Sequence, residues 1–487
     1  MSFISREFLV FFAVVVAVYF TLPYRLRWAW LLSASLYFYG SAEPLFLIQI
    51  LAATAVAYVA GLLIERAPDK AGKKTYLVIG LCLLVGNLVA FKYTGFLNES
   101  LRAIFELAGL AYPVPSLSIL LPIGISFYTF LLVGYLTDVF RGTRAERHAG
   151  IFSLYVLFFP KVVSGPIERT NNLLPQLHAP PPFSYELAVF GLQLILWGIF
   201  KKAVVADRIV ILVQDVYSAP HAADGVTMMA ATVLYAFQLY CDFSGYTDIA
   251  LGAAAILGYK LIGNFNRPYF ATSIADFWKR WHISLTSWLT DYVYTPLTRQ
   301  RVLKIKFFTM MLVGLFITFV VSGLWHGAGW TFVVWGMLHG AYIVTSLLFQ
   351  KQRNKFVRWI GLDKWPTLHR AIKIAITFTL VCYAYVWFRA ESAADAIYIT
   401  THLFTGWNNP LGSLRTFISG DSSGFVIAVI GIAIVIAGDV IQGKGGMRAV
   451  LAARPAWMRW SLYYAGATSI LLFGVIYFNQ AFLYFRF

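Results

Sequence analysis

Apolar runs of about 20 residues recur along almost the whole chain, and this pattern restricts the fold more than any other feature. A helix needs about 20 mostly apolar residues to cross the hydrocarbon layer of a bilayer. Runs of this length lie near residues 7–23, 44–64, 75–95, 183–200, 226–257, 306–324, 328–349, 370–388, 423–441 and 460–483. Hydrophobic residues make up 59% of the chain and charged residues only 13%, which excludes an ordinary soluble enzyme and a disordered chain. The sequence therefore predicts an all-α polytopic membrane protein.

Shorter or interrupted apolar stretches predict helices that enter the membrane only partly or lie on its surface. They fall at 28–40, 98–112, 117–140, 149–164 and 393–406. Such segments are stable at membrane depth only where protein or a water-filled cavity covers their backbone. We expect about 10–12 spanning helices with re-entrant or interfacial helices between them. No internal repeat or soluble domain is evident, so residues 1–487 are predicted to form a single integral membrane domain.

The basic residues are concentrated in short connections between the apolar runs. The chain has 39 Lys and Arg against 22 Asp and Glu, a formal net charge of +17. The most basic connections are 65–74, 141–148, 299–306 and 351–358, which predicts that these four lie on the cytoplasmic side. This distribution indicates contact with membrane lipids and their anionic headgroups, and it argues against nucleic acid as a partner.

Between residues 117 and 340 the sequence changes character, because polar, Gly, Pro and His residues interrupt the apolar segments. Each would be costly against lipid, so we expect them to face one interior cavity. We assign to this cavity the side chains of Ser126, Tyr128, Asp242, Ser244, Tyr246, Asn264 and Trp325. The region 117–340 is the predicted catalytic core, flanked by spans in 1–116 and 345–487.

His326 follows a continuous apolar run, 307–321, and precedes Gly327, so it is predicted to lie at membrane depth. Ionisable side chains inside a membrane are usually functional, and histidine suits proton abstraction from a hydroxyl near neutral pH. The alternative is a structural histidine that hydrogen-bonds a neighbouring helix.

His282 lies in a basic and aromatic segment, 278–285. If this segment is helical, Asp276 meets Lys279 and Arg280 at spacings of three and four residues and pairs with part of their charge. The remaining charge and His282 could meet a phosphate-bearing substrate. An interfacial anchor of Trp and Lys/Arg explains the same composition.

Three further polar residues are interpreted as structural. On a regular helix His339 would lie about 20 Å from His326, so the two share a site only if the intervening glycines break the helix. Asp242 and Asp248 point in different directions on a helix, and each is expected to bond Arg or His from another helix. No phosphate loop, nucleophile elbow or metal motif is evident.

From the residues alone, a buried histidine and a basic aromatic segment share a polar membrane cavity. That fits an enzyme that moves an activated group. It equally fits a transporter or flippase of a polysaccharide precursor with proton-linked histidines, although such proteins are usually built from repeats. A structural scaffold for a polysaccharide-export complex would be insensitive to substitution of His326.

The ordered polar segments resemble the membrane-bound O-acyltransferase family, in particular bacterial alginate O-acetylases and the D-alanyl transfer protein of teichoic acid. The resemblance covers roughly 117–340 and rests on the segments 122–127, 164–166, 239–248, 264–269, 276–285, 291–294 and 323–327. It departs after Tyr294, where the short basic stretch 298–306 replaces a Gly/Asn-rich loop of alginate acetylases. The polymer, the partner and the donor therefore stay open.

The resemblance implies a fold in which spanning helices surround a central funnel, in a bacterial plasma (inner) membrane. It places the two signature positions on His326 and His282, as general base and as the residue that orients carbonyl or acceptor. Acetyl-CoA or another acyl thioester would be the donor substrate, with no tightly bound cofactor and no metal. Its phosphates would be attracted by Lys279, Arg280, Arg299 and Arg301. The expected partners are an extracytoplasmic SGNH-hydrolase-like acyltransferase and a polysaccharide acceptor.

Overall fold

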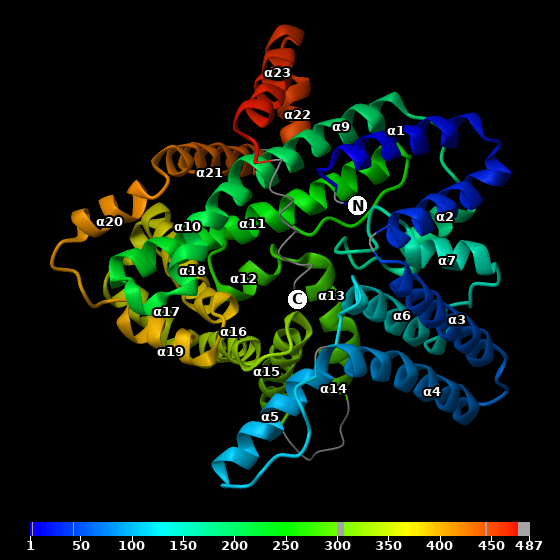
Figure 1. Cartoon of the computed structure of the whole chain (residues 1–487), viewed down its shortest axis with the longest axis horizontal. Coiled ribbons are helices and arrows are strands. Elements are labelled where there is room, and N and C mark those ends of the chain that lie inside the picture. Colours follow the sequence, from blue (N-terminus) through cyan, green and yellow to red (C-terminus); the bar gives the residue numbers. More distant parts are fainter. Residues whose placement is uncertain (2, 42, 118, 300–305, 444–445, 476–487) are drawn as a thin grey trace. The chain divides into compact units, whose positions relative to one another are not determined.

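A computed structural model describes residues 1, 3–41, 43–117, 119–299, 306–443 and 446–475 (Figure 1). The described residues fold into helices and connecting loops, with no β-strand among them. Helices satisfy every interior backbone hydrogen bond within one segment, which the hydrocarbon of a bilayer requires.

The chain divides into two compact units. The first contains Met1–Ile195 and Ile249–Ile262, and the second contains Leu196–Asp248 and the described residues from Gly263 to Val475. The boundary falls inside two helices, α9 (Tyr185–Ile199) and α11 (Gly225–Ile256).

The first unit is built mainly from helices of the N-terminal part of the chain. They are α1 (Arg6–Thr21), α2 (Tyr24–Gly40), α3 (Pro44–Arg66), α4 (Lys70–Leu88), the π-helix η1 (Val89–Tyr93), α5 (Thr94–Leu107), α6 (Ile125–Phe140), α7 (Ala149–Leu157) and α8 (Thr170–His178). Glycines let α3 and α4 approach α6 closely: a side chain at Gly61 would collide with Tyr135, and one at Gly80 with Leu136. Small residues are the usual means of close helix packing in membranes.

The second unit carries most of the predicted catalytic core. Its elements are the π-helix η2 (Phe200–Ala206), α10 (Asp207–Ser218), η3 (Pro220–Ala222), η4 (Pro268–Phe270), α12 (Ile274–Trp278), α13 (Ile283–Leu289), the π-helix η5 (Thr290–Tyr294), α14 (Thr295–Arg299), α15 (Phe307–His326), α16 (Trp330–Leu348), α17 (Gln350–Trp359), η6 (Leu362–Lys364), α18 (Pro366–Arg389), α19 (Ala393–His402), α20 (Pro410–Ser419), α21 (Ser422–Gln442), α22 (Met447–Ala452) and α23 (Ala456–Phe473).

Eight helical stretches in the described residues are long and apolar enough to cross a membrane, which agrees with the predicted multi-pass class. They are Pro44–Arg66, Lys70–Leu107, Tyr185–Ser218, Gly225–Ile256, Phe307–His326, Trp330–Leu348, Pro366–Arg389 and Ser422–Gln442. The first predicted span, 7–23, corresponds to the shorter helix α1, with 16 residues. The last, 460–483, overlaps α23 and continues outside the described residues. The stretch 98–112 is not separate, because α5 continues directly from α4 through η1.

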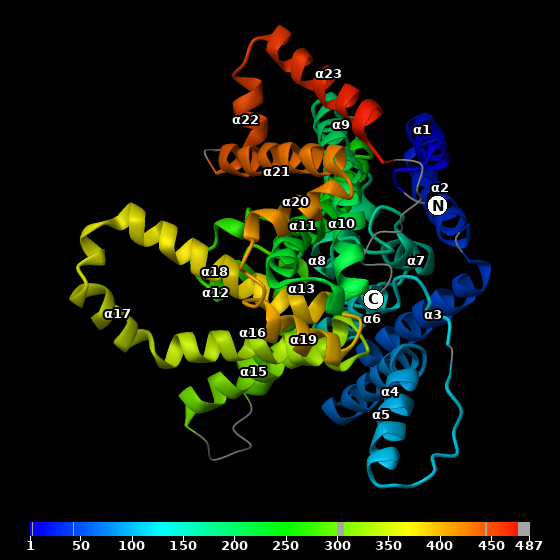
Figure 2. The same cartoon turned by 60° about the vertical axis from the view of Figure 1, so that its left-hand side comes forward.

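Helices α15 and α16 form a tight antiparallel pair in the second unit (Figure 2). A side chain at Gly323 would collide with the carbonyl oxygen of Phe332, and one at Gly336 with that of Phe319. A side chain at Gly327, in the turn between the helices, would collide with the Phe332 ring. The glycines therefore permit the sharp reversal that follows His326.

Candidate active site

His326 is the last residue of α15 and is 1% exposed. Its ring packs edge-on against three aromatic rings, with centroid distances of 4.9 Å to Trp325, 4.9 Å to Trp335 and 5.4 Å to Phe388. The helix ends at this residue because Gly327 adopts an extended backbone. The apolar run thus delivers a histidine into a buried aromatic environment at a helix terminus.

His282 lies in a tight turn between α12 and α13, and it is fully buried. Its backbone is left-handed, with φ 45° and ψ 53°, a conformation that non-glycine residues adopt at a cost of roughly 1–2 kcal/mol. The segment is therefore not one continuous helix from Asp276 to His282. Burial lowers the pKa of the His282 ring below its usual value, which keeps the imidazole neutral.

Asn264 holds the backbone that follows His282. Its carbonyl oxygen accepts from the N–H of Ile283 at 3.0 Å, and its Oδ1 accepts from the N–H and the hydroxyl of Ser284 at 3.3 Å and 2.6 Å. The Asn264 side chain also donates to Thr247 Oγ1 in α11 at 3.5 Å. Asn264 is fully buried, so these bonds are sheltered from competition with solvent.

The two predicted catalytic histidines lie side by side. The centroids of the His282 and His326 rings are 6.2 Å apart and their planes are inclined at 64°. Trp325 contacts both, at 5.7 Å from His282 and 4.9 Å from His326. Phe243 of α11 closes the other side of His282, with its ring centroid at 4.8 Å. Residues from α11, α13 and α15 thus converge on one pair of imidazoles.

His339 lies one aromatic ring away from this pair. The ring of Trp335 in α16 contacts the rings of both His326 and His339, with a centroid distance of 4.9 Å to each. The Nδ1 of His339 accepts from the indole N–H of Trp278 at 3.2 Å. The separation expected for a regular helix does not apply, because the turn after His326 folds α16 back along α15. The contacts of His339 fit a residue that supports the aromatic wall.

Asp242, Ser244 and Asp248 of α11 bind a buried pair of lysines in η2. Lys202 lies 2.7 Å from Asp242 and 2.8 Å from Asp207, and its side chain is 1% exposed. Lys201 lies 2.7 Å from Asp248 and donates to Ser244 Oγ at 2.9 Å. The prediction that the two aspartates have separate partners is correct. The expected partner types, Arg or His, are wrong, because lysines fill both places.

The basic residues predicted for the donor are distributed unevenly. Arg280 is 2.8 Å from Asp276, as the spacing of four residues predicts. Partial burial by itself raises the pKa of Asp276, but the hydrogen bonds from Arg280 and Thr272 together with the charge of Arg280 outweigh it, and the pKa lies below its usual value. Lys279 is exposed in the same turn, and Arg299 is exposed at the end of α14. Arg301 lies outside the described residues.

The remaining predicted cavity residues are buried, but they belong to different units. Ser126 and Tyr128 lie in α6 of the first unit, where Ser126 Oγ accepts from Lys92 Nζ at 3.0 Å. Tyr246 lies in α11 and is 2% exposed. The site that the structure brings together within the second unit is therefore His282, His326, Trp325 and Asn264. Two of the carboxylates that bind the lysines lie on α11, the helix that also supplies Phe243 beside His282.

Comparison with known proteins found a matching family and similar relatives. The model of the membrane-bound O-acyltransferase family matches residues 149–388, which include both histidines. A probable alginate O-acetylase, AlgI, of Pseudomonas putida is 34% identical over 84% of this chain and 81% of its own length. The chain belongs to the membrane-bound O-acyltransferase family. It is therefore a polytopic membrane enzyme that transfers acyl groups to hydroxyls.

Other members of the family are similar over large parts of the chain. A peptidoglycan O-acetyltransferase of Helicobacter pylori is 31% identical over 76% of this chain and 72% of its own length. A teichoic acid D-alanyltransferase of Bacillus subtilis is 29% identical over 55% of this chain and 69% of its own length. Alginate O-acetylases and D-alanyltransferases are the branch that the polar segments resemble.

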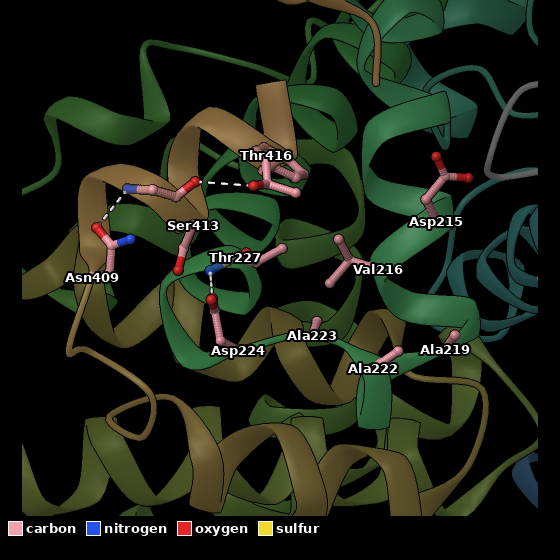
Figure 3. Close-up of a pocket in the computed structure, with 12 residues that line it drawn as sticks. Asp215, Val216, Ala219, Ala222, Ala223, Asp224, Thr227, Asn409, Ser413 and Thr416 are labelled. Carbon is pink, nitrogen blue, oxygen red and sulfur yellow. Dashed lines mark hydrogen bonds between the residues drawn. The ribbon is translucent and has the colours of Figure 1, made fainter. Parts of the chain in front are cut away.

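A separate pocket of 530 Å³ lies in the second unit between α10, η3, the start of α11 and α20 (Figure 3). Its polar groups already serve the helix ends: Asp224 accepts from the N–H of Thr227 at 2.8 Å, and Asn409 accepts from the N–H of Gly412 at 3.1 Å. None of its lining residues belongs to the histidine pair or its neighbours. The candidate active site of this acyltransferase does not include it.

Two groups of site residues escaped the sequence analysis. Lys201 and Lys202 follow an apolar run, so their position in the sequence suggests the basic end of a spanning helix. The carboxylates in the next apolar run were the available signal that these lysines form buried ion pairs. Trp335 and Phe388 are ordinary members of apolar helices in the sequence, and only tertiary packing places them on His326.

Proposed function

We propose that this membrane-bound O-acyltransferase takes an acetyl group from acetyl-CoA at the cytoplasmic face of a bacterial inner membrane. It delivers the group towards a cell-envelope or secreted polysaccharide on the other side. Two of the similar relatives are named for O-acetyl transfer, to alginate and to peptidoglycan, which supports an acetyl group. An SGNH-hydrolase-like protein outside the membrane is the proposed partner that receives it or passes it on.

The observation that carries this proposal is the contact between the rings of His326 and His282, 6.2 Å apart in a buried aromatic environment. At this separation the two imidazoles can both reach one small group held between them. Water is largely excluded there, so a proton transfer and a hydrogen bond to a carbonyl act at low local dielectric.

In the proposed reaction, a ring nitrogen of His326 takes the proton of the acceptor hydroxyl. The hydroxyl oxygen then attacks the thioester carbonyl carbon, a C–O bond forms, and the C–S bond breaks. The thiolate leaves with the electron pair of that bond and is protonated by the imidazolium of His326. His282 donates a hydrogen bond to the carbonyl oxygen, where negative charge develops, or orients the acceptor.

Exposed basic groups before and after the turn of His282 in the chain support a donor with phosphates. Lys279 is exposed three residues before His282, and Arg299 is exposed at the end of α14, which follows from α13 through η5. Cationic side chains form charge-assisted hydrogen bonds to phosphate oxygens. Coenzyme A carries such phosphates, and a thioester on a carrier protein is the second candidate donor.

The proposal is tested with purified protein in proteoliposomes that contain labelled acetyl-CoA on one side and acceptor on the other. We expect His326→Ala to lose acetyl transfer by a factor of about 10²–10⁴, the usual contribution of a positioned general base. We expect His282→Ala to lower turnover severely while a trace remains. The matched control is His221→Ala, which removes an exposed histidine of the same unit.

Folding is checked for each variant by size-exclusion chromatography and thermal unfolding. Normal acetyl transfer by folded His326→Ala would refute the catalytic role of this histidine. Activity of the unchanged protein with a carrier-protein thioester but none with acetyl-CoA would refute the proposed donor and leave the histidine pair unaffected.

A further inference from the structure

Helix α17 carries a basic face and a separate aromatic face, and both are open to the surroundings. Lys351, Lys355 and Arg358 are spaced four and three residues apart, so they lie on one face of the helix. All three are exposed. Three like charges on neighbouring turns repel one another, and an anionic surface beside this face would relieve that repulsion.

The second face of α17 is apolar and strongly exposed. Phe356 and Trp359 lie on this face and Ile360 follows as the cap residue of the helix; the three are 56%, 80% and 47% exposed. It is rotated from the basic face by roughly a third of a turn around the helix axis. A helix with a basic face and an aromatic face of this kind is typical of segments that lie in the interface of a membrane.

The chain places α17 at the end of two spanning helices. It begins two residues after α16 ends at Leu348, and α18 begins at Pro366 (Figure 2). Arg353 Nη1 donates to Ser346 Oγ of α16 at 2.8 Å across this bend. Gly361, with φ +70°, ends the helix and reverses the chain towards α18. The helices on both sides, α16 and α18, are long and apolar enough to cross a membrane, which would bring α17 to its surface.

We propose that α17 is an in-plane helix that binds anionic phospholipid headgroups through Lys351, Lys355 and Arg358 while Phe356, Trp359 and Ile360 enter the headgroup and acyl boundary. Three lipid phosphates or fewer can satisfy the basic face, and the adjacent apolar side chains occupy the depth just beneath. A free anionic ligand would satisfy the charges but would leave the aromatic face in water. An acidic protein surface would need an apolar patch at the same spacing.

The proposal is tested by titrating the full-length protein in nanodiscs with phosphatidylglycerol and counting bound lipid by native mass spectrometry. A basic residue near an anionic membrane surface strengthens binding about fivefold. The triple variant Lys351→Gln, Lys355→Gln, Arg358→Gln should therefore lose roughly a hundredfold in phosphatidylglycerol affinity. Its titration with phosphatidylcholine should stay unchanged.

The matched control removes the same three charges from another basic connection, Lys70→Gln, Lys73→Gln, Lys74→Gln at the start of α4. This control measures what the loss of any three basic residues costs. A phosphatidylglycerol affinity of the α17 variant equal to that of the unchanged protein would overturn the proposal. So would an equal loss for phosphatidylcholine, because the surface would then not select charge.

A second measurement needs no variant of the basic face. A nitroxide attached at Trp359→Cys, in a background with the exposed Cys82 replaced by Ala, reports the depth of the apolar face by power-saturation EPR. We expect the label at the boundary of headgroups and acyl chains in phosphatidylglycerol bilayers. A label in bulk water would overturn the proposal, and it would be the result expected for a surface that docks an acidic protein.

Discussion

Removal of the Asn264 side chain should release the strained turn at His282 without touching the imidazole. In the second unit, Asn264 Oδ1 accepts from the N–H and hydroxyl of Ser284, two residues after His282. Asn264→Ala removes this acceptor from two buried donors. Buried donors that lose an acceptor cost roughly 1–3 kcal/mol each, so the turn loses about 2–6 kcal/mol of support.

The loss of support decides which backbone conformation His282 adopts. The left-handed conformation of a non-glycine residue costs roughly 1–2 kcal/mol, which the bonds of Asn264 offset in the native turn. Without them, a relaxed turn is favoured by that amount, and the left-handed conformation of His282 is populated about 3–16% of the time. Turnover should therefore fall about 6- to 30-fold, while the KM for the donor changes little.

The assay is acetyl transfer in proteoliposomes, combined with a double-mutant cycle. In a His282→Ala background, Asn264→Ala should cause no further loss of turnover, because the residue that it positions is already absent. The matched control is Asn266→Ala, an exposed asparagine two residues away whose backbone N–H, not its side chain, bonds Arg280. Independent, multiplicative effects of Asn264→Ala and His282→Ala would refute the positioning role.

Three further changes test the site from other directions. His282→Gly should unfold at a higher temperature than His282→Ala, by about 1 kcal/mol in stability, because glycine adopts the left-handed conformation without strain; an equal or lower melting temperature would contradict this. Lys202→Met should lower the free energy of unfolding by roughly 3–5 kcal/mol, because it leaves two buried carboxylates without their cation. Chemical unfolding in detergent measures this, and an unchanged free energy of unfolding would contradict it. Arg299→Glu should raise the KM for acetyl-CoA, more at low salt, whereas Lys73→Glu should not; equal KM values for the two variants would remove Arg299 from the donor site.

The spanning helices are predictable from the sequence because hydrocarbon imposes one length and one hydropathy on each of them. The eight spanning stretches coincide with predicted runs for this reason. Their exact relations are less predictable. The hydropathy pattern ends this span near residue 95. In the structure, α4 continues through η1 into α5, so the more polar segment Thr94–Leu107 extends the same helical stretch.

The histidine pair is only partly readable from the sequence. His326 can be predicted because it ends an apolar run. The turn at His282 cannot, because the spacing of Asp276 and Arg280 also suits a continuous helix. Asp276 and Arg280 do pair as a helical spacing predicts, yet the helix ends at Trp278 and His282 turns left-handed. The reason lies far along the chain, since Asn264 supplies the bonds that hold this turn, and no local pattern reports them.

Helix α11 connects the buried lysine-carboxylate cluster with the turn that carries His282. Ser244 and Asp248, four residues apart, share one face of α11 and both contact Lys201. Phe243 and Thr247, also four residues apart, share the neighbouring face and contact His282 and Asn264. The ion pair and the hydrogen bond on the first face therefore fix the rotation of α11, and this rotation determines where the second face meets the histidine turn. Buried ion pairs add little net stability, but they can specify a single arrangement, and in this acyltransferase the arrangement that they specify is the position of His282 beside His326.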